Sequence, residues 1–401
     1  MAQLFPFRAL RPAPAVASEV ASVPYDVVST VEARELAAAN PLSFLRVTRA
    51  EIDLPPETNP YDPSVYTSAG RNFEELKRAA PMVLDPDPAL YFYRLRTGVH
   101  EQIGLAGCFS LDEYDGDLIK KHEKTRREKE DDRTRHIVEL RAQTGLVFLA
   151  YRASSAITAV AERVLGGDPL YDFTAPDGVE HAAWRVTGPD AAALVDAFAA
   201  LPALYIADGH HRVASAARAR EALAGAGSSS RVVAVAFPDD QVQILAYNRT
   251  VKDLAGQTPG DFLAALSSRM PVSDGHPVPE GPGKVSMYLA GRWHALTLPA
   301  AAPGTARAET LDVDVLSRQV LEPLLKVGDI RSDKRVDFVG GGRGAQALER
   351  LVDDGRAAVA FSMYPVGVAD LLAIADDGGI MPPKSTWFEP KLRDGLLVHL
   401  I

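Results

Sequence analysis

The sequence is poor in cysteine. Cys108 is the single cysteine among 401 residues, so an internal disulfide and a metal site built from several cysteines are both excluded. It lies in the apolar stretch GLAGCFSL. A buried, unreactive thiol is the favoured interpretation there over a nucleophile, because free cysteines are commonly buried.

Long apolar runs are also missing. No stretch approaches the roughly 18 uncharged apolar residues that a membrane-spanning helix needs. The opening MAQLFPFRALRPAP has early prolines and no apolar segment, which is not the pattern of a signal peptide. We therefore expect a soluble, cytoplasmic protein that has no membrane partner.

Positive charge is in deficit. The chain has 43 Lys and Arg against 53 Asp and Glu, a formal net charge of −10. Proteins that bind nucleic acid usually carry the opposite sign on their binding face, so nucleic acid is disfavoured as a partner. The hydrophobic content of 47% and charged content of 24% are ordinary for a globular protein.

Both strand and helix patterns are present. Stretches with the length and composition of strands occur at 89–95, 103–111, 145–151, 203–208, 231–237 and 284–291. Helical patterns are clearest over 191–201, 213–226 and 314–325. Because the two types do not alternate strictly, the sequence predicts a mixed α/β (α+β) fold rather than a Rossmann repeat. We expect an α/β core over 1–230 and a second α/β sub-domain over 231–401.

One polar cluster falls between a predicted strand and a predicted helix, in IADGHHRVASAARAR (206–220). The first N–H groups of a helix lack intrahelical partners and carry partial positive charge, so such a turn suits an anion. Gly209 allows close backbone approach, and Arg212 is suited to hold a phosphate with two hydrogen bonds. His210 and His211 add donors whose charge changes near neutral pH.

Asp208 ends the predicted strand, where it would orient a magnesium ion or act on a substrate hydroxyl. The plainer interpretation makes Asp208 the N-cap of the helix and the two histidines surface residues. Adjacent histidines are not a metal site by themselves, because their side chains point in different directions. No protein metal site is predicted.

A second polar cluster, KKHEKTRREKEDDRTRH (120–136), holds eight basic and five acidic residues. On a helix, His122 and Arg126 would be i,i+4 neighbours, as would Glu123 and Arg127. A solvated charged helix is the default interpretation. The alternative is a phosphate clamp with Glu123 as general base. The phosphate contacts of that clamp would be Lys124, Thr125 and Arg133.

Near the C-terminus, MPPKSTWFEPKL begins with two prolines that favour extended backbone. Lys384, Ser385 and Thr386 then supply a charge and two hydroxyls, which would suit a phosphate or a carboxylate. A rigid structural loop is the alternative. In YNRTV (247–251), Asn248 and Arg249 are suited to bind a substrate carboxylate. The glycines of FVGGGRGAQALERL (338–351) do not have dinucleotide-binding spacing and indicate a turn before a helix.

Taken together, these stretches resemble a bacterial and archaeal family catalogued as domain of unknown function 1015. The resemblance is carried by six segments. They are VPYDVV (23–28), NPLSFLRV (40–47), KHEKTRREKEDDRTRH (121–136), YIADGHHRVASAA (205–217), YNRTV (247–251) and GGIMPPKSTWFEPKLRDGLL (378–397). The family name implies no activity.

The DGHHR turn is also similar to the signature of the ParB and sulfiredoxin-like superfamily, which includes free-serine kinases. The resemblance implies a ParB/sulfiredoxin-like core. It implies that Asp208 lies at the reaction centre and that Gly209, His210, His211 and Arg212 contact nucleotide phosphates. A separate glutamate activates the serine hydroxyl in those enzymes, and Glu123 is the looser candidate for it here.

These observations predict a nucleotide-dependent phosphotransferase, an ATP- or ADP-dependent kinase of a small hydroxy compound for which free serine is the candidate. Its catalytic residues would be Asp208, Glu123 and His210, and magnesium would be its ion. A phosphoserine-directed phosphatase and a non-catalytic nucleotide-binding regulator are the alternatives. The phosphate donor, the direction of transfer and a homodimeric state all stay open.

Overall fold

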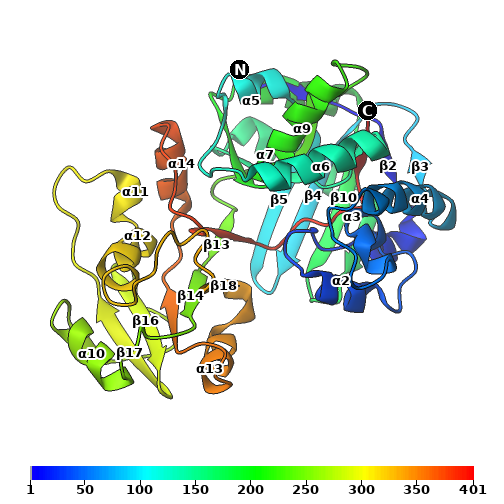
Figure 1. Ribbon diagram of the computed structural model, residues 1–401. Helices are drawn as coiled ribbons and strands as arrows, with labels where there is room; N and C mark the ends of the chain where they lie inside the picture. The colour runs from blue at the N-terminus through cyan, green and yellow to red at the C-terminus, as the bar shows by residue number, and fades with distance from the viewer. Residues whose placement is uncertain (1) are drawn as a thin grey trace. The chain divides into compact units, whose positions relative to one another are not determined.

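The computed structural model describes residues 2–401, which form two compact units (Figure 1). The first unit is Met1–Val242 with Pro390–Ile401, and the second is Gln243–Glu389. The boundary expected after residue 230 would assign strand β12 (Arg231–Pro238) to the second sub-domain. It lies in the first unit because it pairs with two strands of that unit's sheet. Within residues 2–401, no helix is long and apolar enough to cross a membrane.

The first unit is built on a nine-stranded sheet of order β6-β11-β8-β12-β5-β4-β10-β9, with β1 added to β5. These strands are β1 (Leu4–Phe5), β4 (Leu90–Thr97), β5 (His100–Ser110), β6 (Ile119–Lys120), β8 (Val147–Tyr151), β9 (Tyr171–Thr174), β10 (Glu180–Val186), β11 (Leu204–Asp208) and β12. Seven of the eight residues of β12 are buried, as expected for a central strand rich in valine and alanine that is covered on both faces. The mixed α/β class is confirmed, while the ParB/sulfiredoxin-like character stays a prediction.

Helices surround this sheet. They are α1 (Ala17–Val20), α2 (Thr30–Ala37), α3 (Leu45–Thr48), α4 (Pro63–Ala79), α5 (Leu111–Asp115), α6 (Arg127–Leu140), α7 (Ser155–Leu165), α8 (Gly188–Ala199) and α9 (His210–Ala222). A smaller four-stranded sheet, β3-β2-β21-β7, joins β2 (Ala9–Arg11), β3 (Val83–Leu84), β7 (Ala142–Gln143) and the C-terminal β21 (Val398–Leu400). The C-terminal strand therefore belongs to the first unit.

Helices α6 and α9 lie side by side in Figure 1. Small residues on α9 allow this close approach, and Ser215 Oγ donates to Glu130 O at 3.2 Å. The predicted charged helix is wrong over residues 121–126, which are not helical. Because β6 pairs with β11, the chain leaves the sheet edge in an extended form and becomes helical at Arg127.

The second unit contains a six-stranded sheet of order β15-β17-β16-β19-β14-β18 and a two-stranded sheet of β13 and β20. Its strands are β13 (Gln243–Leu245), β14 (Tyr247–Val251), β15 (Val272–Asp274), β16 (Lys284–Leu289), β17 (Arg292–Thr297), β18 (Val336–Gly340), β19 (Val359–Met363) and β20 (Trp387–Glu389). Its α-helices are α10 (Pro259–Ser267), α11 (Arg307–Thr310), α12 (Asp312–Leu316), α13 (Ala345–Asp353) and α14 (Val368–Asp376). The helix expected over 314–325 continues from α12 as a π-helical turn, η3 (Ser317–Leu321). The glycine-rich stretch is a turn before α13, as predicted.

Candidate active site

The site is built on the turn that joins β11 to α9. Gly209 is in the left-handed region, with φ 98° and ψ 29°, and its carbonyl accepts the first helical bonds, from Arg212 N at 2.8 Å and Val213 N at 3.1 Å. A Cβ atom at position 209 would lie 3.2 Å from Arg212 Nη1 and 3.5 Å from Val147 Cα. Glycine alone meets both requirements without strain. The turn therefore brings backbone close to the amino-terminal end of a 13-residue helix, a location that suits an anion.

A Gly209→Ala substitution is expected to lower the free energy of unfolding by about 1–3 kcal/mol, through left-handed strain plus crowding. Gly98→Ala is the matched control, since Gly98 also has a positive φ of 57° but a Cβ there would meet nothing within 4 Å. Urea denaturation of both variants measures the difference. Equal losses would show that crowding at Gly209 adds nothing.

Asp208 lies at the end of β11 and is paired with Lys391, whose Nζ is 2.9 Å from Asp208 Oδ2. Burial by itself raises the pKa of Asp208, but the charges of Lys391 and Arg212 outweigh burial and hold that pKa below its usual value. Asp208 is thus ionised at neutral pH and can bind a metal ion or orient a hydroxyl group. Sequence reasoning missed Lys391, for which the only signal was its place in the C-terminal motif.

The charged segment meets the DGHHR turn. The backbone N–H of His122 points to His210 Nε2 at 3.4 Å, and the two rings pack edge to face with centroids 4.4 Å apart. His210 Nδ1 lies 3.9 Å from Glu123 Oε2. Since Nε2 of His210 accepts, its proton is assigned to Nδ1, facing Glu123. Arg126 N donates to His211 Nε2 at 3.0 Å, so both histidines of the turn contact this segment.

Both members of the packed pair, His122 and His210, are neutral at pH 7. Burial lowers the pKa of His122 to about 4 and that of His210 well below its usual value. The expectation that the charge of His210 changes near neutral pH is therefore wrong, although its Nδ1–H is still a donor. His122 is 2% exposed, and within residues 2–401 neither of its ring nitrogens has a hydrogen-bond partner. Buried polar atoms rarely lack a hydrogen-bond partner. His122 was not predicted as a site residue from the sequence.

The side chain of Arg212 is buried and bonds to other groups of the first unit. Its Nη2 donates to both carboxylate oxygens of Asp26, at 2.8 and 3.0 Å, and its Nη1 donates to Leu146 O at 2.9 Å. The side chain is 7% exposed. These groups occupy both terminal nitrogens of the guanidinium, which is not the arrangement expected of a phosphate contact. The side chain anchors the first turn of α9 instead.

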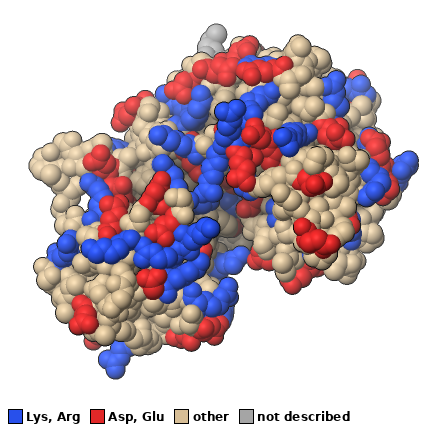
Figure 2. All heavy atoms as spheres, in the orientation of Figure 1, with Lys and Arg blue, Asp and Glu red and all other residues tan. Residues whose placement is uncertain are grey.

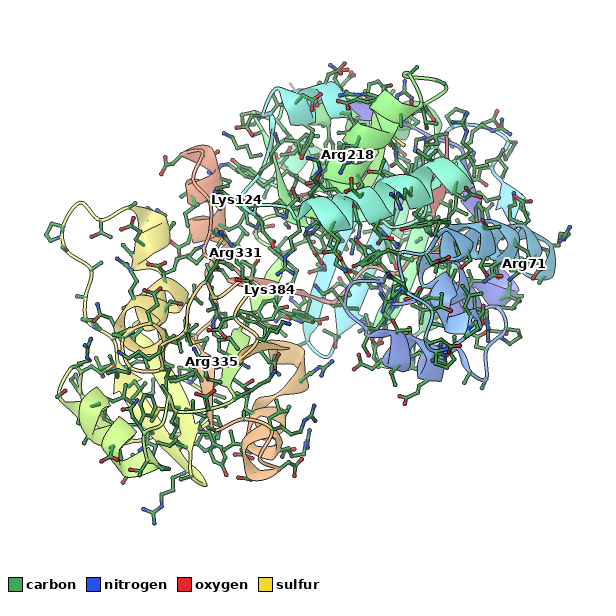
Figure 3. The ribbon with its side chains drawn as sticks, viewed as in Figure 1. Arg71, Lys124, Arg218, Arg331, Arg335 and Lys384 are labelled. Atoms are coloured by element: carbon green, nitrogen blue, oxygen red, sulfur yellow. The ribbon has the colours of Figure 1, made fainter. Side chains whose placement is uncertain are left out.

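Arg133 is likewise internal and not placed as the expected phosphate contact. Its Nη1 donates to Thr48 O at 3.1 Å and its Nε to Asp132 Oδ2 at 2.9 Å. Lys124 is exposed on the segment before α6 (Figure 3), and the Thr125 hydroxyl donates to Glu130. Of the predicted contacts on the charged segment, Lys124 is the one whose side chain extends to solvent.

A small cavity of about 30 Å³ is lined by Tyr25, Arg133, Arg212 and Asp394 among others. Asp394 is 1% exposed, and within residues 2–401 its Oδ2 has no hydrogen-bond partner. Burial raises the pKa of Asp394 to about 7 despite the opposing charge of Arg212. Asp394 is therefore a buried acid close to half-protonation at neutral pH.

An Asp394→Asn substitution is expected to gain stability relative to the parent as pH rises. A folded pKa near 7 against an unfolded value near 3.9 makes the folded parent bind more protons between these values. The parent therefore loses stability as pH rises from about 4 to 7, by roughly 2–4 kcal/mol. Urea denaturation at pH 5 and pH 8 measures this, with the exposed Asp196→Asn as control. A pH-independent difference would contradict the prediction.

The five other predicted site residues, Asn248, Arg249, Lys384, Ser385 and Thr386, belong to the second unit. Asn248 Oδ1 accepts from Met363 N at 3.0 Å, so this amide joins β14 to β19 rather than facing a substrate. Arg249 Nη2 donates to Lys384 O at 3.0 Å, and Ser385 Oγ donates to Pro382 O at 2.6 Å. The structure thus brings Arg249 to the backbone of the predicted Lys384–Thr386 cradle, while the Ser385 hydroxyl is used inside the loop.

Comparison with known proteins gives a family and several solved structures. The model of the family described as "Protein of unknown function (DUF1015)" matches residues 4–316, a range that ends before the C-terminal MPPKST segment. No curated protein matches the sequence.

Three solved structures have low similarity to the chain, and each alignment covers 74% of it. A free serine kinase mutant in complex with AMP is 14% identical, with TM-score 0.40 and 92% of its own chain covered. SbnI with a C-terminal truncation, from Staphylococcus aureus, is 14% identical, with TM-score 0.41 and 87% covered. A conserved hypothetical protein from Pyrococcus furiosus is 15% identical, with TM-score 0.36 and 95% covered.

Proposed function

The chain belongs to the DUF1015 family, whose description assigns no activity, and we propose from its site that it transfers a phosphoryl group from a nucleotide to a small hydroxy compound. One observation carries the proposal. The amino-terminal end of α9 is approached by an ionised aspartate, Asp208, and by the buried neutral pair of His122 and His210. Phosphoryl transfer requires anion binding and positioned acid–base groups at the same place.

The nucleotide phosphates are proposed to bind at the start of α9. Backbone N–H groups and the helix dipole favour negative oxygens there, and Gly209 allows the tight turn that a Cβ would crowd against Arg212 and Val147. Lys391, 2.9 Å from Asp208, adds a positive charge. On the face drawn in Figure 2, Lys and Arg lie interspersed with Asp and Glu, so the proposal depends on this local geometry and not on a broad basic surface.

Magnesium fits the residues at the turn. Within residues 2–401, His, Cys, Asp and Glu form no group of three or more that would hold a metal unaided. Magnesium is commonly held by one or two carboxylates together with substrate phosphates, and the ionised Asp208 meets that requirement. When bound, the ion would neutralise charge on the phosphates.

The acceptor hydroxyl is proposed to lose its proton to Glu123, whose carboxylate lies 3.9 Å from His210 Nδ1. The hydroxyl oxygen forms a bond to the terminal phosphorus, and the bond from that phosphorus to the bridging oxygen breaks. A nucleotide with one phosphate fewer leaves. Free serine is the proposed acceptor, on the sequence resemblance of the DGHHR turn to free-serine kinases.

Calorimetric titration with ADP and ATP, with and without magnesium, tests the binding half of the proposal. Detection of phosphoserine by ³¹P NMR after incubation with serine and nucleotide tests the transfer half. Failure of both nucleotides to bind at millimolar concentration would overturn the proposal. Nucleotide binding without turnover would favour a regulator, and release of phosphate from phosphoserine without nucleotide would favour a phosphatase.

A further inference from the structure

The second unit contains a separate pocket. It lies between β14, α12, the π-helical turn η3, the loop that follows, and the Pro382–Pro383 segment. Its volume is about 230 Å³, which is smaller than a site for a drug-sized molecule and therefore suits a small ligand. Figure 3 labels Arg331, on the loop after η3, and Lys384, which follows Pro383. None of the residues at the α9 turn takes part in this pocket.

Arg249 lines the pocket and is short of a counter-charge. It is 1% exposed, and its guanidinium donates only to backbone carbonyls, those of Tyr247, Pro383 and Lys384. In the part of the chain that the structure describes, no carboxylate pairs with it and its Nε has no hydrogen-bond partner. Burial lowers the pKa of Arg249 to about 9. A buried cation without an anion is costly, so the pocket wall is suited to receive one.

Negative charge comes from three carboxylates that also line the pocket, Asp314, Glu322 and Asp329, while Arg331 is a second cation of the lining. Asp314 Oδ2 is 2.6 Å from Arg318 Nε, and Asp329 Oδ1 accepts from Arg331 N at 2.9 Å. Glu322 N donates to Ser317 O at 3.0 Å, a bond that spans five residues. Such π-helical turns occur frequently at functional sites, and this one places Ser317 and Glu322 in the pocket lining.

We propose that this pocket binds a free α-amino acid, with its carboxylate on Arg249 and its ammonium group toward the carboxylates of Asp314, Glu322 and Asp329. A guanidinium binds a carboxylate with charge-assisted hydrogen bonds. The three acidic side chains would repel a phosphate or a dicarboxylate, and the buried guanidinium would repel a simple cation. A small zwitterion satisfies both sets of charges.

This inference does not rest on phosphoryl transfer, because it uses no residue of the DGHHR turn and no nucleotide. The sequence YNRTV alone led to the expectation that Arg249 binds a carboxylate. The pocket adds the carboxylates that would bind the ammonium group of the same ligand. Asn248, the neighbour named with it, is engaged with Met363 and is not part of the pocket.

Calorimetric titration of the full chain without nucleotide tests the inference on a matched set of ligands. Glycine, L-alanine and L-serine carry both charged groups, L-lactate lacks the ammonium, and ethanolamine lacks the carboxylate. The amino acids are expected to bind at least about tenfold more tightly than the two others, because ethanolamine leaves the buried Arg249 guanidinium without an anion and L-lactate makes no ion pair with the pocket carboxylates. The inference would be overturned if none of the three amino acids bound at 10 mM, or if L-lactate bound as tightly as they do.

Variants locate the site. Arg249→Lys retains the charge but loses the planar fork, and Glu322→Gln removes one pocket carboxylate, so each is expected to weaken amino-acid binding about tenfold or more. Arg356→Gln, at an exposed arginine of the same unit, is the control. If Arg249→Lys fails to fold, Glu322→Gln decides alone, and unchanged binding would overturn the site. If the chain binds amino acids but does not bind nucleotides, the proposed function is contradicted and this inference is supported.

Discussion

The Asp208→Asn variant is expected to lose phosphoryl transfer by about a thousandfold or more, the scale at which removal of a preorganised charged group acts on turnover. Asparagine keeps the shape of the side chain and removes its charge. That charge holds Lys391 at 2.9 Å and is the group proposed to bind magnesium beside the phosphates. The turnover number for phosphoserine formation is the measurement, at saturating serine and nucleotide.

The control for this variant is Asp112→Asn. Asp112 is also an aspartate paired with a cation of the first unit, Arg220 at 3.0 Å, but its side chain is 86% exposed. Exposed pairs contribute little, so turnover should be unchanged. Lys391→Met adds a second readout. Without the ammonium the pKa of Asp208 rises, so the acid limb of the pH–rate profile should move to higher pH. Near-parental turnover in Asp208→Asn would remove Asp208 from the chemistry.

Local patterns predicted the elements that carry the site. An apolar run ending in Asp208, a glycine and an alanine-rich stretch are sufficient to indicate strand, turn and helix, because each depends on residues adjacent in sequence. The β11–Gly209–α9 turn follows that prediction closely. The same reasoning failed at 121–126, where a charged pattern indicates a helix but pairing of β6 with β11 decides the backbone.

Long-range partners account for the other errors. The inward orientation of Arg212 depends on Asp26, 186 residues away, and the charge on Asp208 depends on Lys391, 183 residues away. Neither pairing leaves a periodic signal in the sequence. The neutrality of His210 likewise follows from burial against His122, which a residue list does not show. Residue types were therefore predictable at this site, but their charge states and directions were not.

Acidification is expected to unfold the first unit before the second. Five histidines of the first unit are buried, and burial lowers the pKa of each below its usual value. They are His122, His136, His181, His210 and His399. Above about pH 6.5 these histidines are mostly neutral in both the folded and the unfolded chain. As pH falls from 6.5 toward 4, the unfolded chain binds protons that the folded unit does not, and stability is lost.

The size of this effect follows from the shifts. A histidine with an unfolded pKa near 6.5 and a folded value near 4 removes about 2 kcal/mol of stability between pH 7.5 and pH 5. Four such groups, His122, His136, His181 and His399, approach the whole stability of an ordinary domain, about 5–15 kcal/mol. Asp394 acts in the opposite sense, since its raised pKa adds stability on acidification, and it offsets about one histidine. The net change is therefore a loss.

Tryptophan fluorescence separates the two units during urea denaturation at pH 7.5 and pH 5. Trp184 lies in the first unit, whereas Trp293 and Trp387 lie in the second, so variants that keep one tryptophan report on one unit. His399→Gln should reduce the acid loss of the first unit by about 2 kcal/mol, while the exposed His276→Gln should leave it unchanged. His399 suits this test because it bonds Ser228 Oγ at 2.9 Å and takes no part in the α9 turn. An acid loss that is equal in both units, or unaffected by His399→Gln, would show that buried neutral histidines do not set the pH dependence.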